Sequence, residues 1–434
     1  MQFTSTPVEL HPDVQLPDDG RLEAITTRWT PSDGEAACFV VSAGPSLDRA
    51  PQLAEITGLT EAHGSRVVGT AILRLDRPHP KTWFGAGQCE RLAASAREVG
   101  ATMLVVDAQL SPSQTRNLED ATGLHVADRE VIILGVFLRN ARSKRSRIQV
   151  EIAQLEFLRP RIRGLGLDMD QQAGGVMNGK GAGETASELL ARQLDGRLVQ
   201  LRRQAERLDR SATLRRQRSE GVPRIALVGY TNAGKTSLMN ALTGSELSAR
   251  ARPFETLDTT TRALTRHGGD VLVGDTVGFI RDLPERLLPS FASTLVDALD
   301  ASLLALVLDA SDPEWPLHLR TTEEVLDQVG GGDIPRLLVF NKCDDAELLP
   351  DIDRDHVHVS ALDPDSVAML RERLIDLARP DTVETWLDLP YDQPERHRAV
   401  YRNCVVLEAH AGDSSLRVKV RGAAAMVAKL QGVA

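Results

Sequence analysis

The chain has few cysteines and aromatic residues, and it has no long apolar run. Its four cysteines, Cys38, Cys89, Cys343 and Cys404, show neither metal-site nor disulfide spacing, which favours a reducing compartment. The longest apolar run, 302–308, has the length of a strand and is far too short to cross a membrane. The polar, acidic N-terminus has no apolar segment typical of a signal peptide. We therefore expect a cytoplasmic protein without stable membrane insertion.

The charge of the chain is unevenly distributed. The 434 residues predict two or three domains, and the net charge of −10, taken over the whole chain, argues against a nucleic-acid partner. Residues 139–224, however, hold 19 Lys/Arg and 10 Asp/Glu, a local balance of +9 that leaves −19 for the remainder. Such asymmetry is typical of a nucleic-acid-facing surface on an acidic body, and equally of a solvated arginine-rich helix.

The pattern G-x-x-x-x-G-K-[ST] lies at 229–236, between an apolar run expected to form a buried strand and a segment expected to begin a helix. In that context the glycines let backbone N–H groups turn toward a nucleotide's phosphates, and the helix N-terminus adds partial positive charge. Lys235 can neutralise the β- and γ-phosphates, and the Thr236 hydroxyl can bind Mg²⁺. The alternative is an ordinary tight turn between a strand and a helix.

The pattern N-K-x-D at 341–344 follows another apolar run and indicates the base. Guanine presents two donors, N1–H and the 2-amino group, and the Asp344 carboxylate can accept both. Adenine would leave that carboxylate without partners, and an unmade buried hydrogen bond is costly. Asn341 is expected to hold the loop or the base, and the Lys342 stem to cover the base. The alternative is a polar turn after a strand, which the phosphate loop upstream argues against.

Two further strand ends complete the predicted site. D-x-x-G after a strand supplies the Asp275 carboxylate for the Mg²⁺ shell and the Gly278 N–H for the γ-phosphate. The backbone of 360–362 can touch the guanine oxygen. A threonine between the phosphate loop and Asp275 is expected to bind Mg²⁺ as well. The segment 254–262 offers four candidates, of which we favour Thr256.

The predicted residues fall into three sets. The catalytic set is Lys235, Asp275 and Gly278, and the side-chain ligands of Mg²⁺ are Thr236 and Thr256. The nucleotide-binding set consists of Gly229, Tyr230, Thr231, Asn232, Ala233, Gly234, Lys235, Thr236, Ser237, Phe254, Glu255, Thr256, Asp275, Thr276, Val277, Gly278, Asn341, Lys342, Asp344, Ser360, Ala361 and Leu362.

The basic region predicts two long helices. Leucines and alanines recur at three- and four-residue steps over 184–218, which indicates one apolar stripe, and 131–158 is expected to form a second long helix. The two can pair as an antiparallel hairpin joined by a glycine-rich loop, 174–183. That loop contains G-x-x-x-x-G-K, but Gly181 stands where Ser or Thr is required. The loop therefore favours contact with a macromolecular partner, or a plain connector, over a second nucleotide site.

The remaining segments predict a small domain at each end. Before the hairpin, strand-like and helix-like segments alternate, which favours a parallel sheet. The strand-like segments are 37–42, 66–73, 102–107 and 124–126, and the helix-like ones are 53–63, 88–99 and 112–122. After residue 380, the segments 401–410 and 415–420 alternate like a β-hairpin before a short helix from Ala423.

The expected fold class is α/β. A Ras-like doubly wound domain is preceded by a small α/β domain with the long antiparallel helical hairpin, and is followed by a small α+β appendage. The expected divisions are a flexible N-terminus at 1–30, the first domain at 31–130, the hairpin at 131–220, the nucleotide domain at 221–380 and the appendage at 381–434.

Together these motifs resemble the HflX family of GTPases. The resemblance is carried by 229–236, 275–280, 341–344, 110–118, 128–129, 149–155, 160–161 and the 174–185 loop, over about residues 35–380. It implies GTP hydrolysis and binding to the 50S ribosomal subunit, with the glycine loop and the hairpin reaching rRNA near the peptidyl transferase centre. It also implies a role in splitting stalled ribosomes. The expected partners are GTP or GDP and the 50S subunit with its rRNA, and no DNA, and the expected state is a monomer.

The expected RNA contacts lie in and beside the glycine-rich loop. They are Gly174, Gly175, Asn178, Lys180, Arg161 and Arg163. The chain departs from the family at two places here. It carries Met-Asn-Gly-Lys at 177–180 where an Arg-Gly-Pro-like segment is usual, and 141–147 is more basic than is usual.

Phe279 follows Gly278, where Ras-type enzymes have a glutamine that orients water. A phenyl ring cannot polarise water, so we expect slow hydrolysis by the free protein and stimulation when the ribosome orders the loops. Asn232 resembles a residue that helps bind K⁺ in some related GTPases, and loop-stabilising hydrogen bonding is the alternative. Two other functions stay open: a GTPase switch in ribosome assembly or tRNA modification, and a nucleotide-binding scaffold with negligible turnover.

Overall fold

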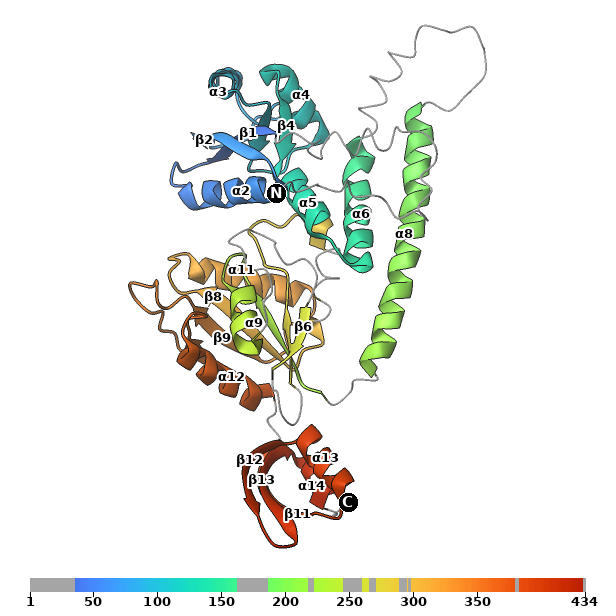
Figure 1. Cartoon of the computed structure of the whole chain (residues 1–434). Helices are drawn as coiled ribbons and strands as arrows, with labels where there is room; N and C mark the ends of the chain where they lie inside the picture. Colours follow the sequence, from blue (N-terminus) through green and yellow to red (C-terminus); the bar gives the residue numbers. More distant parts are fainter. Residues whose placement is uncertain are drawn as a thin grey trace, which may run out of the picture. The chain divides into compact units, whose positions relative to one another are not determined.

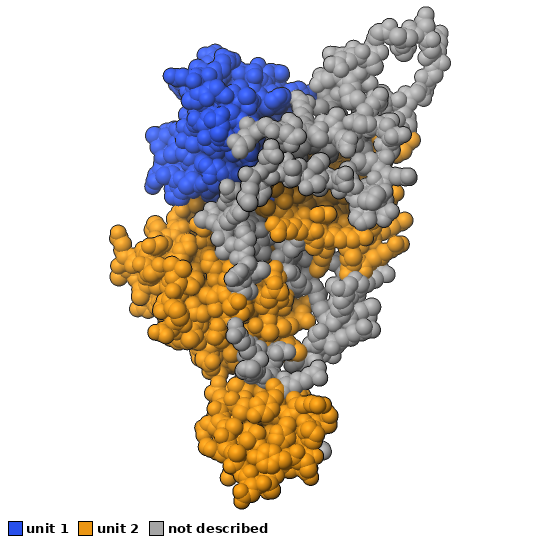
Figure 2. Space-filling model, in the orientation of Figure 1, with its two compact units in different colours: residues 1–136 blue, residues 137–434 orange. Residues whose placement is uncertain are grey.

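The computed structural model describes residues 36–161, 186–217, 222–244, 260–264, 271–288, 295, 298–378 and 382–431. The chain divides into two compact units, residues 1–136 and 137–434 (Figure 2). Among the described helices, none is long and apolar enough to cross a membrane.

The first unit is built on a four-stranded parallel sheet with the strand order β2-β1-β3-β4 (Figure 1). Each strand is followed along the chain by a helix, and this alternation in the sequence predicted the parallel sheet, which the structure confirms. The central strand β1 is buried on both faces, so its sequence is a continuous apolar run. The elements are β1 Ala37–Gly44, α2 Ala50–His63, β2 Arg66–Arg74, α3 Ala86–Glu98, β3 Met103–Val106, α4 Pro112–Thr122 and β4 His125–Asp128.

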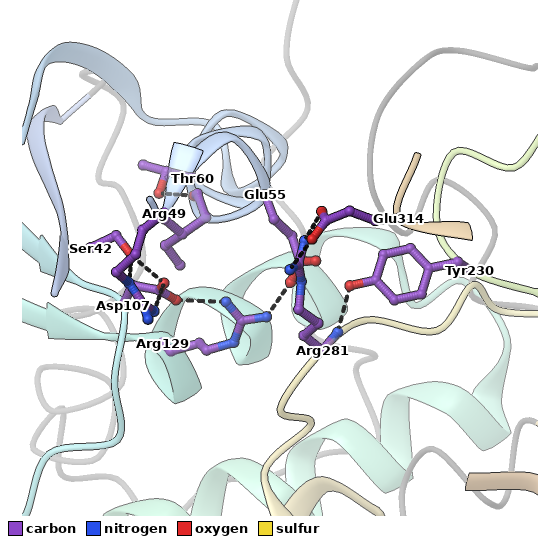
Figure 3. Close-up of polar contacts among 10 residues, drawn as sticks. Ser42, Arg49, Glu55, Thr60, Asp107, Arg129, Tyr230, Arg281 and Glu314 are labelled. Carbon is purple, nitrogen blue, oxygen red and sulfur yellow. Dashed lines mark hydrogen bonds and ion pairs between the residues drawn. The ribbon is translucent and has the colours of Figure 1, made fainter. Parts of the chain in front are cut away.

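A buried polar cluster joins the carboxyl ends of β1, β3 and β4 (Figure 3). The Arg129 side chain donates from Nη1 to Asp107 Oδ1 at 2.7 Å and pairs through Nη2 with Glu55. Asp107 Oδ2 also accepts from Ser42 Oγ at 2.9 Å, and Ser42 Oγ accepts from Arg49 Nε at 3.0 Å. Buried charges need such partners, because an uncompensated buried charge is strongly destabilising. The cluster therefore holds the helices and strands of this unit at one end of its sheet.

The predicted helix over 131–158 is wrong as a single element. The structure has two helices, α5 Arg129–Asn140 and α6 Lys144–Leu158, separated by three residues. Ser143 causes the second start: its backbone is extended (φ −72°, ψ 154°), and its Oγ accepts the Ser146 N–H at 3.1 Å. A serine in this position satisfies one of the donors that the first turn of a helix leaves without a partner.

The helical hairpin is confirmed, with α6 as its first arm and α8 Ala186–Gln217 as its second (Figure 1). The two run antiparallel, and a short 3₁₀ turn, η1 Arg159–Arg161, ends the first arm. Between the arms, Arg197 and Arg202 of α8 pair with Glu151 and Glu156 of α6, each at 2.7 Å. The predicted apolar stripe of α8 is buried at Leu194, Leu198, Leu201 and Ala205.

The nucleotide domain has a six-stranded sheet with the order β10-β9-β8-β5-β7-β6. All neighbours are parallel except β6 and β7, which are antiparallel. Its apolar core lies between the sheet and the helices α9 and α12. The elements are β5 Arg224–Gly229, α9 Lys235–Thr243, β6 Thr260–Ala263, β7 Leu272–Asp275, η2 Glu285–Leu287, β8 Leu303–Asp309, α11 Trp315–Gln328, β9 Arg336–Asn341, β10 His356–His358 and α12 Pro364–Ala378.

The C-terminal part is an α+β appendage, as expected, but its first half differs from the prediction. The strand predicted over 401–410 begins only at Val405, because 394–403 form a helix that Pro394 starts and that buries Val400. A further strand before it, in which Leu387 and Leu389 are buried, was not predicted. The antiparallel order is β11-β13-β12. The elements are β11 Thr382–Pro390, α13 Pro394–Asn403, β12 Val405–Ala411, β13 Ser415–Ala423 and α14 Ala424–Gln431.

Replacing Ser143 with alanine removes the oxygen that accepts the Ser146 N–H. We expect the start of α6 to lose about 1 kcal/mol of stability, which appears as faster amide hydrogen exchange over its first turn. Ser113→Ala is the matched control, because Ser113 is exposed in the first turn of α4, outside the hairpin. Equal exchange of α6 in Ser143→Ala and the wild type would contradict the role of Ser143.

Candidate nucleotide site

The parallel strands bring the predicted segments to one edge of the six-stranded sheet. The segment 229–236 follows β5, 275–278 follows β7, 341–344 follows β9, and 360–362 follows β10. Since the carboxyl ends of parallel strands meet at one edge, these four segments lie beside one another. Ligands of open α/β sheets bind at this edge.

The backbone of the phosphate loop needs its two glycines. Gly229 has φ +152°, and a Cβ there would lie 2.1 Å from the backbone oxygen of Val307 on β8. Gly234 has φ +86°, and a Cβ there would lie 2.3 Å from Nδ2 of Asn341. Both positions therefore combine a left-handed backbone with a close neighbour, which excludes any larger residue. Asn232 also has a left-handed backbone, with φ +64°.

Lys235 begins α9 and is held inside the phosphate loop. Its Nζ donates to the backbone oxygens of Gly229 at 3.0 Å and Tyr230 at 2.8 Å, and only 7% of the residue is exposed. Burial lowers the pKa of Lys235 from 10.5 to about 8, although the charge of Asp275 opposes this effect. The loop thus positions an ammonium group whose charge is only partly compensated by neutral carbonyls. An anionic phosphate would compensate it better.

The side chains of Thr236 and Asp275 meet at the ends of α9 and β7. Thr236 Oγ1 donates to Asp275 Oδ2 at 2.7 Å, and Asp275 is fully buried. A hydroxyl and a carboxylate are hard oxygen ligands of the kind that Mg²⁺ takes together with water and phosphate oxygens. In the described part of the chain, no group of three or more His, Cys, Asp or Glu could hold a metal by itself. These two residues therefore fit a Mg²⁺ whose shell a bound nucleotide completes.

The next two predicted residues after Asp275 turn their side chains into the core. Thr276 Oγ1 donates to the backbone oxygen of Leu227 at 2.7 Å, and Val277 is fully buried. It is therefore the backbone of 276–278 that can face a nucleotide.

At the base end of the site, Asn341 connects two loops. Its Nδ2 donates to the Ala233 oxygen at 2.9 Å, and its Oδ1 accepts the Ala361 N–H at 3.2 Å. Lys342 has a left-handed backbone (φ +62°), and its Nζ pairs with Asp309 Oδ2 at 2.6 Å. Asp344 is exposed, so a guanine base could reach its carboxylate. Leu362 is also exposed, whereas Ser360 is buried.

Phe279 is bonded to the phosphate loop through its backbone. Its N–H donates to the Gly229 oxygen at 3.0 Å, and its oxygen accepts the Thr231 N–H at 2.8 Å. Its ring is buried, with 1% of the residue exposed. The structure therefore places no water-orienting side chain at this position, in agreement with the chemistry expected of phenylalanine.

Several predicted residues lie outside the described part of the chain. They are Phe254, Glu255, Thr256, Arg163, Gly174, Gly175, Asn178 and Lys180. Arg161 is described: its guanidinium lies 3.4 Å from the centre of the Phe157 ring, and its Nη1 donates to the Phe157 oxygen at 3.1 Å.

Sequence reasoning missed three side chains next to the site. Asp309 holds Lys342, and its position at the end of an apolar strand is a signal that could have revealed it. Arg281 and Glu314 pair across 33 residues, and no local pattern in the sequence connects them.

Three family profiles match consecutive parts of the chain. The profile described as GTP-binding GTPase N-terminal matches residues 50–138, that of the GTP-binding GTPase middle region matches 140–219, and that of the 50S ribosome-binding GTPase matches 224–342. A solved GTP-binding protein from Sulfolobus solfataricus, in complex with GDP, is similar at 24% identity and a TM-score of 0.43, over 78% of this chain and 98% of that chain.

Two curated relatives cover most of the chain. GTPase HflX of Spirochaeta thermophila is 39% identical over 389 residues, 88% of this chain and 95% of the relative. GTPase HflX of Gluconacetobacter diazotrophicus is 37% identical over 412 residues, 92% of this chain and 87% of the relative. At this identity and coverage, and with the segments predicted to bind phosphate, magnesium and guanine at one sheet edge, the chain belongs to the HflX family of GTPases and hydrolyses GTP.

Proposed function

We propose that this GTPase binds the 50S ribosomal subunit in its GTP state, splits or rescues stalled ribosomes, and hydrolyses GTP rapidly only on the ribosome. The observation that supports the proposal is the predicted nucleotide site, in which Thr236 bonds to Asp275 and the ring of Phe279, at the position of the water-orienting glutamine, is buried. A GTPase that lacks one catalytic group hydrolyses GTP slowly until a partner supplies that group, and this suits a signalling state that the partner ends.

The residues of the site divide the chemistry among them. Lys235 would neutralise charge on the β- and γ-phosphates, and the Gly278 N–H would donate to the γ-phosphate. Thr236 and Asp275 would hold Mg²⁺, which neutralises charge that develops on the phosphate oxygens. Asp344 would accept both donors of the guanine edge. We also propose K⁺ as a second cation, since Asn232 offers an amide oxygen within the loop.

The hairpin supports an RNA partner. Two arginines on α8, Arg197 and Arg202, form ion pairs with glutamates of α6. Arg203 and Arg207 are exposed on the same helix. Exposed guanidinium groups along one rigid helix can contact successive phosphates of an RNA, which neutral or acidic surfaces cannot do. The ribosomal RNA is the partner that this basic arm would reach.

The central test uses purified 50S subunits. We expect the protein to co-sediment with 50S in the presence of a non-hydrolysable GTP analogue, and 50S to accelerate hydrolysis by ~10²-fold or more, the contribution of one positioned catalytic group. Lys235→Ala should abolish nucleotide-dependent binding and turnover. Equal rates with and without 50S would refute the stimulation, and equal sedimentation with GDP and the analogue would refute a GTP-dependent partner.

A second test concerns the base. Asp344→Asn removes an acceptor for two guanine donors, so we expect GTP affinity to fall by roughly 100-fold and xanthosine triphosphate to bind better than GTP. The neighbouring Asp345→Asn is the control, because Asp345 is also exposed and lies outside the predicted set. Titration with fluorescent nucleotides measures both. Unchanged base preference in Asp344→Asn would show that Asp344 does not read the base.

A third test follows from the lowered pKa of Lys235, about 8 in the free protein. A bound polyphosphate favours the ammonium form and raises this pKa, so binding at about pH 8.5 should take up about 0.7 proton. Calorimetry in buffers of different ionisation enthalpy measures the uptake. Lys235→Arg is the control, since a guanidinium does not titrate there. The same uptake in both proteins would exclude Lys235 as its source.

A further inference from the structure

The segment 277–281, here called the cover segment, lies directly on the phosphate loop. Two backbone hydrogen bonds join Phe279 to Gly229 and Thr231. One of them occupies the Thr231 N–H, an amide of the loop that is expected to face phosphate. The cover segment thus occupies one N–H of the loop that a bound nucleotide would otherwise use.

Gly278 of the cover segment is packed closely against the loop. A Cβ at Gly278 would lie 2.9 Å from Lys235 Nζ and 2.9 Å from Thr231 Cα. The terminal phosphate of a triphosphate must lie between Lys235 and the Gly278 N–H, since both are to contact it. In this conformation Gly278 lies against Lys235 and Phe279 occupies the Thr231 N–H, so we expect a γ-phosphate to require the cover segment to move outward.

Four side chains hold the cover segment where it is, and Figure 3 shows three of them, Tyr230, Arg281 and Glu314. The Tyr230 hydroxyl accepts the Arg281 N–H at 2.7 Å. The Arg281 guanidinium donates from Nη1 and Nη2 to both carboxylate oxygens of Glu314, at 3.2 and 3.0 Å. The Tyr230 ring stacks on His318 with 3.8 Å between ring centres and 12° between planes. We call Tyr230, Arg281, Glu314 and His318 the anchor residues.

The anchor residues are well placed to hold a segment firmly. Tyr230 and His318 are 5% and 7% exposed, and the Arg281 side chain is 11% exposed. A two-point arginine–carboxylate pair fixes direction as well as distance, and shielding from water strengthens it. Glu314 immediately precedes α11 and His318 lies within it. The anchor residues therefore join the cover segment to helix α11 of the nucleotide domain.

We propose that the anchor residues set the preference of the site for GDP over GTP. With the anchor intact, the cover segment stays on the loop, where it opposes the γ-phosphate but not the α- and β-phosphates. A triphosphate must displace the cover segment and break its bonds to the loop, so the anchor opposes GTP without opposing GDP. A ligand shifts such an equilibrium only by its difference in affinity for the two conformations. The proposal rests on the proposed placement of the nucleotide on the 229–236 loop.

The test compares the Kd of GDP with that of a non-hydrolysable GTP analogue. Glu314→Gln keeps the shape of the side chain but removes its charge, so we expect the analogue to gain roughly fivefold to tenfold relative to GDP, whose own Kd stays unchanged. Glu323→Gln is the matched control. Glu323 lies on the same helix and pairs with Arg336 at 3.3 Å, but it has no role in the anchor, so the ratio should stay at the wild-type value.

Two further variants separate the anchor from other roles. Tyr230→Phe keeps the ring stack and removes the acceptor of the Arg281 N–H, so it should shift the ratio toward the analogue by about fivefold. Arg281→Ala should shift the ratio the same way. If Arg281 instead binds the γ-phosphate after release from Glu314, Arg281→Ala would weaken the analogue, and the proposal would fail.

The possible outcomes distinguish a failure of the anchor proposal from a failure of the proposed nucleotide placement. If Glu314→Gln weakens GDP and the analogue equally, or leaves their ratio unchanged, the anchor has a purely structural role and the proposal is overturned. If the wild-type protein and Lys235→Ala bind both nucleotides alike, the placement on the phosphate loop is itself wrong. A shifted ratio in Glu314→Gln, together with loss of binding in Lys235→Ala, supports both.

Discussion

The two halves of the nucleotide site depend on the amide of Asn341. Its nitrogen donates to the Ala233 oxygen in the phosphate loop, and its oxygen accepts the Ala361 N–H in the loop after β10. The approach is so close that Gly234 must lack a side chain. A single hydrogen bond contributes only about 1 kcal/mol net, but a buried amide left without partners costs more. The glycine–lysine motif and the asparagine–lysine motif are therefore parts of one structure, although 108 residues separate the bonded pair.

Much of the architecture is predictable because its causes are local. Apolar runs at 225–228, 303–308 and 337–340 are long enough for buried parallel strands, and the motifs that follow them mark the edge where ligands bind. The helix break at Ser143 was missed because apolar periodicity continues on both sides of it, and only the cap geometry reveals it. Tyr401 was placed in a strand because alternation over a few residues does not distinguish a strand from the end of a helix.

The contacts around Arg281 show what a sequence does not reveal. Arginine, glutamate and histidine are ordinary surface residues, and their meeting at Tyr230 requires the completed fold. The same is true of Lys342 and Asp309, which lie at the ends of the neighbouring strands β9 and β8. The basic surplus of the sequence lies at 139–224, which includes the hairpin, whereas the residues predicted to bind the nucleotide lie after it. The segment proposed to contact RNA is thus distinct from the domain proposed to bind GTP.

The gathering of the site from separate strand ends has a consequence for folding. The loops after β5, β7, β9 and β10 become neighbours only when parallel strands far apart in sequence have paired. Such pairings are slow, because chain entropy is lost before the contacts form. The site is therefore complete only in the folded domain, and a nucleotide that binds it stabilises the folded state by an amount that grows with the logarithm of ligand concentration. For a newly made chain, guanine nucleotide would then shift the folding equilibrium toward the folded domain, because it binds only that state.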